Sequence, residues 1–194
     1  MTRRNWLKSI QAIVLGGLLC VGFCASAETF YWTGAANDGN KTGTAGNWSL
    51  SSGGPAAGTA PGQGDTVVFE NKEALTLTKS GNLSYLAYEF RGANVILPKG
   101  SNLRQYGWGG GGITATGTGT YTFGFPLELN ASQFTGDDKT FTVDVREGAT
   151  VVVTEDSSGT TKIYSPANFI KRGAGTFMCT EFLPSDVNSR GDLT

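Results

Sequence analysis

The stretch that decides the fold class is residues 140–154, T-F-T-V-D-V-R-E-G-A-T-V-V-V-T. Apolar and polar residues alternate in its first half, so Phe141, Val143 and Val145 would share one face of an extended strand. The turn E-G-A follows, and a second run rich in valine begins directly after it. Beyond the N-terminal segment, no stretch of the sequence has a sustained helical period. We therefore expect an all-β protein.

Short runs of the same kind recur along the chain, each bounded by Gly, Asn, Asp or Pro. We expect further strands at 66–69, 74–78, 83–90, 94–97, 113–116, 121–123 and 125–129. Two architectures fit this spacing. One is a parallel β-helix, in which each coil of roughly 20 residues stacks on the one before it. The alternative is an antiparallel β-sandwich. Irregular turns favour the β-helix, because hairpins prefer two-residue turns of the Asn-Gly type.

The N-terminus predicts export. It begins with the basic segment M-T-R-R-N-W-L-K, followed by an apolar run at 10–24 and by the small residues A-S-A, which end at Ala27. This order is typical of a secretory signal peptide, so we assign 1–27 to the signal and place cleavage after Ala27. The apolar run is too short and too glycine-rich for a comfortable membrane span. Arg3 and Arg4 resemble a twin-arginine signal, or are the positive charges that any signal peptide carries.

Composition excludes several classes of function. The chain has 15 basic and 16 acidic residues and no histidine. Cleavage removes Arg3, Arg4 and Lys8, which leaves 12 basic residues against 16 acidic ones and a net charge of −4. Without a basic patch, nucleic acid is not an expected partner. Without histidine, the commonest general base and metal ligand is missing, so we expect no cofactor and no enzyme.

The region 28–70 differs from the rest, because most of it consists of small residues and turns. Trp32 and Trp48 are exceptions, and rings of this size need burial or a ligand. One interpretation is an irregular glycine-rich N-terminal cap over the open end of the β core, which solenoids require. The other is a platform for stacking on carbohydrate, formed by Trp32, Trp48 or Trp108.

Several motifs resemble the N-terminal region of bacterial proteins built on autotransporter-associated β-strand repeats. They are Y-W-T-G-A from 31, G-N-W from 46, P-G-Q-G-D-T-V-V-F from 61, G-G-I from 111 and F-P-L-E-L from 125. The repeat itself reads apolar-x-Lys-x-Gly-x-Gly-Thr-apolar-x-apolar. Its places at 169–179 are taken by Phe169, Lys171, Gly173, Gly175, Thr176, Phe177 and Cys179.

This resemblance implies a right-handed parallel β-helix outside the cell or on its surface, with coils over 71–194. It implies a non-enzymatic passenger or surface-adhesin scaffold, associated with the outer membrane or periplasmic if the chain is a fragment. The family stacks many repeats, whereas one clear repeat stands here. We therefore expect either a fragment truncated at its C-terminal end or a degenerate short member of the family.

The stretch F-I-K-R-G-A-G-T-F-M-C at 169–179 also invites comparison with a phosphate-binding loop. Such a loop places its lysine after the last glycine and continues into a helix. Here Lys171 precedes both glycines, and a strand-like run follows them. We therefore expect a tight turn between two strands, with Cys179 facing inward as a small hydrophobic residue.

Other candidate sites have simpler explanations. The carboxylate pairs at 137–138 and 155–156, and Asp144 with Arg146 on one strand face, are expected to face water. The loop at 38–43 resembles half of a calcium loop but lacks its closing glutamate, so we expect an Asx-type turn. Chance also accounts for the glycosylation patterns at Asn47, Asn82 and Asn130 and for the adhesion-like tripeptide Arg190-Gly191-Asp192.

The sequence thus favours an exported scaffold. The alternatives are a carbohydrate-binding module and, less favoured, a polysaccharide-degrading β-helix enzyme, which would need clustered acids in a cleft. Expected partners are surface glycans or components of a host or neighbouring cell. An open last coil also predicts self-association at the C-terminal end, since unpaired strand edges invite pairing.

Overall fold

The protein is described by a computed structural model, which places residues 27–79, 85–97, 105–106, 111–125, 127–130, 140–154, 161–164, 168–179 and 182–184. Within these residues the only helix is the short 3-10 helix η1 (Ala45–Asn47). All other regular structure is β-strand, so the expectation of an all-β protein is confirmed.

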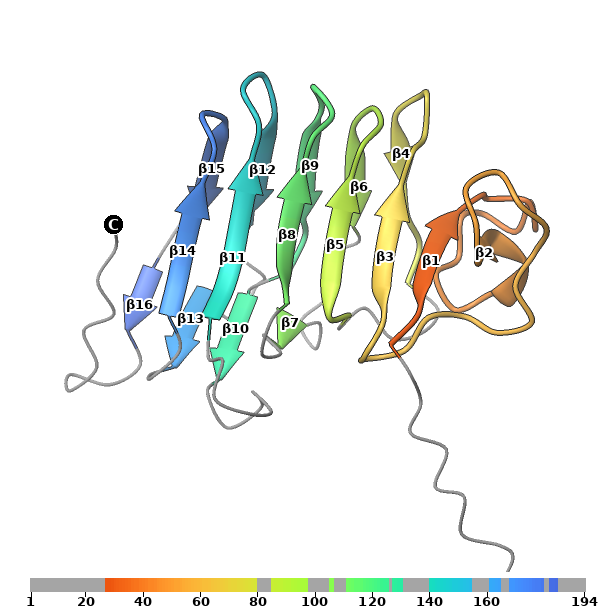
Figure 1. Cartoon of the computed structure of the whole chain (residues 1–194), viewed down its shortest axis with the longest axis horizontal. Coiled ribbons are helices and arrows are strands. Elements are labelled where there is room, and N and C mark those ends of the chain that lie inside the picture. Colours follow the sequence, from red (N-terminus) through yellow and green to blue (C-terminus); the bar gives the residue numbers. More distant parts are fainter. Residues whose placement is uncertain are drawn as a thin grey trace, which may run out of the picture.

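The strands form three sheets (Figure 1). Sheet 1 contains, in spatial order, β14 (Asn168–Arg172), β11 (Thr140–Val145), β8 (Gly112–Ala115), β5 (Ala87–Phe90), β3 (Thr66–Phe69), β1 (Thr29–Trp32) and β2 (Trp48–Ser49). Sheet 2 contains β15 (Thr176–Cys179), β12 (Thr150–Val153), β9 (Thr120–Phe123), β6 (Val95–Leu97) and β4 (Leu75–Thr76). Sheet 3 contains β16 (Phe182–Pro184), β13 (Thr161–Tyr164), β10 (Leu127–Asn130) and β7 (Gln105–Tyr106).

The chain visits the three sheets in turn. From β5 onward, each passage adds one strand to sheet 1, one to sheet 2 and one to sheet 3. We call each passage a layer; the layers are β3–β4, β5–β7, β8–β10, β11–β13 and β14–β16. Every pairing between layers is parallel, and among the described strands only β1 and β2 pair antiparallel. The alternative of an antiparallel sandwich is therefore wrong.

The core is built from columns of side chains that face inward from successive layers. Parallel pairing aligns Phe69 with Phe90, and their rings stack at 5.4 Å and 13°. Phe90 stacks in turn on Tyr121 of sheet 2, at 4.5 Å and 17°. Both geometries lie in the range that favours aromatic pairs. The alternation in 140–145 has the predicted consequence, because Phe141, Val143 and Val145 are completely buried.

The repeat at 169–179 forms a tight turn between β14 and β15, as the sequence predicted. The turn rests directly on the turn of the preceding layer. The Gly175 N–H donates to the Val145 carbonyl at 2.8 Å, and the Thr176 N–H to the Ala149 carbonyl at 3.0 Å. A Cβ on Gly175 would lie 2.1 Å from the Arg146 carbonyl oxygen. The glycine is therefore required by the close approach of two backbones.

The lysine of the repeat closes the same turn. The Lys171 ammonium group donates to the carbonyls of Gly173 and Gly175, the latter at 2.7 Å. Gly173 has φ +74°, a left-handed conformation that glycine adopts at little cost. Phe177 and Cys179 pack against the core, but both are only half-buried. Cys179 thus faces the interior as predicted and is half-buried there.

We predict that Gly175→Ala lowers the free energy of unfolding by about 1–3 kcal/mol, because the added methyl group overpacks the contact between the two turns. Gly58→Ala is the matched control, since a Cβ there meets nothing within 4 Å. It should change stability by less than about 0.5 kcal/mol. Urea unfolding of both variants makes the comparison. Equal effects would contradict the stacked-turn explanation.

Candidate functional site: the cap and the groove beside Trp32

The segment between β1 and β3, residues 33–65, gathers at one end of the stack, and we call it the cap (Figure 1). Its central side chain is Trp48, which is completely buried. The indole N–H donates to the Thr42 carbonyl at 2.9 Å, and the ring meets Phe69 of the first layer at 5.9 Å. Because Trp48 offers no ring face to a ligand, the prediction of glycan stacking is wrong for this residue.

A polar cluster fixes the shape of the cap around Asn47, which is completely buried. Its amide oxygen accepts from the Ala36 N–H at 3.0 Å, and its amide nitrogen donates to the Lys41 carbonyl and to Asp38 Oδ1, both at 2.9 Å. These bonds satisfy the buried amide, as burial requires. The amide that a glycan would modify is thereby engaged inside the protein.

Asp38 completes this cluster. It accepts from the Thr44 hydroxyl at 2.5 Å, from Asn47 and from the Lys41 N–H at 3.2 Å. These bonds, led by those from Thr44 and Asn47, favour the charged form and lower the pKa of Asp38 to about 2. The loop at 38–43 is therefore a turn closed by an aspartate side chain, as predicted. No group of three or more potential metal ligands occurs among the described residues.

The cap is fastened to two of the three sheets. In sheet 1, β2 pairs with β1, placing Trp48 opposite Trp32. In sheet 2, the cap continues the edge beyond β4, where the Thr42 N–H donates to the Thr78 carbonyl at 3.0 Å and the Thr78 N–H donates to the Asn40 carbonyl at 2.9 Å. The aspartate of the P-G-Q-G-D motif, Asp65, accepts from the backbone N–H groups of Glu28 and Gly62.

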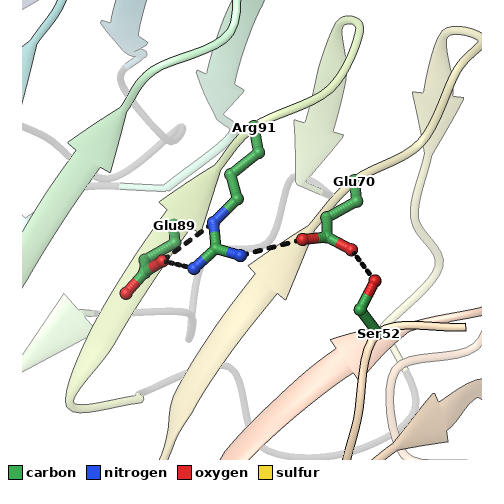
Figure 2. A network of polar contacts seen from close by, with 4 residues as sticks. All are labelled: Ser52, Glu70, Glu89 and Arg91. Atoms are coloured by element: carbon green, nitrogen blue, oxygen red, sulfur yellow. Dashed lines mark hydrogen bonds and ion pairs between the residues drawn. The ribbon is translucent and has the colours of Figure 1, made fainter. Parts of the chain in front are cut away.

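An ion-pair network ties the cap to the first two layers (Figure 2). Arg91 donates to Glu70 at 2.8 Å and to Glu89 at 2.5 Å, and the Ser52 hydroxyl donates to the second oxygen of Glu70. The Ser52 hydroxyl, followed by Arg91, lowers the pKa of Glu70, and Glu89 is the first cause of the raised pKa of Arg91. Because the Arg91 side chain is 43 % exposed, each pair contributes at most about 1 kcal/mol.

A groove with a volume of about 490 Å³ lies where the cap meets the first turn of the first layer. Its lining includes Trp32, Gly34, Asn40, Asn71, Lys72 and Glu73. Trp32 is half-buried, so part of its ring remains accessible, unlike that of Trp48. Of the two proposed glycan-stacking tryptophans that the structure describes, Trp32 and not Trp48 has an accessible surface in a groove.

The structure describes only some of the remaining candidates. Asp144 and Arg146 are both exposed, and no ion pair joins them. Asn130 lies in β10, within sheet 3. Trp108, Asn82, the carboxylate pairs at 137–138 and 155–156, and the tripeptide at 190–192 lie outside the described residues.

Comparisons with protein-family models, curated proteins and solved structures return no match to this chain. The resemblance to autotransporter-associated repeat proteins accordingly remains a prediction based on the motifs. In the part of the chain that the structure describes, no helix has the length and apolar character needed to cross a membrane.

We predict that Trp48→Ala lowers the free energy of unfolding by about 3–5 kcal/mol, because it removes a buried ring and leaves a cavity between the cap and the first layer. Leu50→Ala serves as the control, since Leu50 lies two residues away and is 54 % exposed. Its effect should stay within about 0.5 kcal/mol. Similar losses in the two variants, measured by urea unfolding, would argue against a sealing role for Trp48.

We predict that the Asp38 carboxyl group titrates with a pKa of about 2, below its ordinary 3.8, in an NMR titration of the carboxyl carbon. A lowered pKa in the folded state stabilises the protein above the unfolded-state pKa. This stabilisation is lost as pH falls from 3.8 through about 2. Asp38→Asn should therefore lose less stability than the wild type between about pH 5 and pH 2. A midpoint at or above 3.8 would overturn the assignment.

Proposed function

We propose that the chain is an exported, non-enzymatic scaffold with the architecture of a right-handed parallel β-helix, of the passenger or surface-adhesin type. The observation that carries the proposal is the strand order, because each layer from β5 onward adds one strand to each of three parallel sheets. This is the order that one coil of a β-helix produces. Right-handedness follows from the strong preference of parallel crossovers for that hand.

The distribution of reactive side chains supports a scaffold over an enzyme. Histidine is missing from the whole sequence. Among the described residues, no group of three or more acids, histidines or cysteines is placed to hold a metal ion. Among the described residues, the side chains that face inward are almost all apolar and serve packing.

The proposed location is outside the cell or on its surface. The basic start, the apolar run and the small residues before Glu28 support export by a cleaved signal. Surface glycans or components of a host or neighbouring cell are the proposed partners, together with self-association at the C-terminal end. A second candidate function, carbohydrate binding, is favoured by one specific observation, the groove beside Trp32.

Expression of the full chain in a Gram-negative bacterium tests the export step. We predict that the exported protein begins at Glu28 when its N-terminus is measured by mass spectrometry, because the signal ends with small residues at Ala27. Ala27→Leu is the matched control and should leave the signal attached, since cleavage needs a small residue there. An intact N-terminus on protein that stays in the cytoplasm would overturn the proposal.

The scaffold half of the proposal is tested on the same purified protein. Incubation with a panel of polysaccharides should release no reducing ends and no unsaturated products above a buffer control. Release of either product would show an enzyme and would contradict a purely structural role.

A further inference from the structure

The groove beside Trp32 combines an aromatic surface with unpaired polar groups. It lies between the loop that follows β1 and the turn that follows β3, so the cap and the first layer both contribute to it. Its volume of about 490 Å³ falls within the range of small-molecule sites, about 300–1,000 Å³. Glycan binding at this groove deepens the second candidate function, carbohydrate binding, and is independent of the scaffold proposal.

The aromatic surface is held rigidly. Trp32 meets Trp48 edge-on at 4.9 Å and 85°, and it lies 6.2 Å from Phe69. These contacts fix the half-buried ring, which reduces the entropy that a ligand would lose on binding. The indole N–H of Trp32 donates to no acceptor among the described residues. It lies 3.4 Å from the place that a Cβ of Gly34 would take, and Gly34 itself lines the groove. Because Gly34 has no side chain, none lies over the indole N–H from this position.

Polar groups around this ring leave ion pairs or hydrogen bonds unformed within the described residues. Lys72 and Glu73 are exposed and form no ion pair with any described residue. The amide nitrogen of Asn71 donates to the Glu73 carbonyl at 2.6 Å, while its amide oxygen is buried and receives no hydrogen bond from the described residues. A buried acceptor without a donor is unusual in a folded protein. Asn71 Oδ1 is buried, so the donors and acceptors offered beside the ring are those of the exposed Lys72 and Glu73 side chains.

Local charge narrows the class of ligand. The charges of Lys72 and Glu73 oppose one another, and Glu70 is already paired with Arg91 and Ser52. No excess of positive charge remains to favour a uronic acid or a sulfated sugar. A ligand with an apolar face, several hydroxyl groups and no charge matches the groove best. Pyranose rings have that form, since axial C–H groups cover one face and hydroxyl groups surround the edge.

We propose that this groove binds a neutral hexopyranose unit of a glycan, with the sugar ring stacked on Trp32 and its hydroxyl groups bonded to Lys72 and Glu73. The binding step forms no covalent bond. The site gives the capped end of the stack a recognition role in addition to its structural one.

The test uses the full exported chain on a glycan array that carries neutral, amino, uronic and sulfated sugars. The best neutral oligosaccharide is then titrated by calorimetry. Trp32→Ala should weaken its binding at least about tenfold, the loss expected for an aromatic contact of about 1.4 kcal/mol. Tyr31→Ala is the matched control, because the neighbouring position on β1 points to the opposite face, where the Tyr31 ring lies near Arg91. It should leave affinity unchanged.

A second variant guards against destabilisation, because Trp32 also packs on Trp48. The double change Lys72→Met and Glu73→Gln alters two exposed side chains and should reduce affinity about fivefold or more, with an unchanged Tm. The proposal is overturned by the absence of binding to any neutral glycan, by preferred binding of acidic glycans, or by affinity that neither variant changes. Because the readout is affinity, these outcomes are distinct from a failure of export.

Discussion

Parallel pairing in register is the constraint on which the rest of the structure depends. Neighbouring strands lie about 4.8 Å apart, so each residue sits directly beside its equivalent in the next layer. A large inward side chain must therefore face smaller side chains from the other sheets of its own layer. The second layer places Tyr88 and Phe90 in sheet 1 against Val95 in sheet 2. The third reverses this, with Ala115 in sheet 1 and Tyr121 in sheet 2. The largest side chains thus lie in sheet 1 in the second layer and in sheet 2 in the third.

No layer precedes the first one. Without a cover, β3 and β4 would therefore expose their inward side chains and one strand edge each. The cap and β1 together cover both the side chains and the edges. Trp48 covers the inward face of Phe69, while β1, with its antiparallel partner β2, continues sheet 1 and the bridge between Lys41 and Thr78 continues sheet 2. The hydrogen bonds of Asp38 and Asn47 then hold an irregular loop in one shape. Few apolar residues are needed because hydrogen bonds replace packing there.

Local patterns predicted much of this, and contacts between distant residues account for what was missed. The alternation at 140–154 located β11 and β12 to within one residue at either end. β7, with only two residues, carries no periodic signal, and β1 was interpreted as part of an irregular cap although parallel pairing with β3 makes it a strand. The turn at Gly175 was predicted. The reason that glycine is needed there, the close approach of the Arg146 carbonyl oxygen in the preceding layer, could not be predicted from neighbouring sequence. Ser52 and Arg91 likewise meet through Glu70 only after folding.

Trp32 of β1 and Trp48 of the cap show how one junction can serve both stability and the proposed recognition of a glycan. The sequence alone predicts burial or ligand binding equally for both residues, because each is a large ring among small residues. Folding separates them, since Trp48 points into the stack and is completely buried, whereas Trp32 lies against it and keeps part of its ring in the groove. The buried ring holds the accessible one in place, and a surface fixed before binding loses less entropy when a ligand arrives. The inward side chains of the layers pack against one another, so the irregular backbone at the junction of the cap and the first layer is where we place the proposed glycan site.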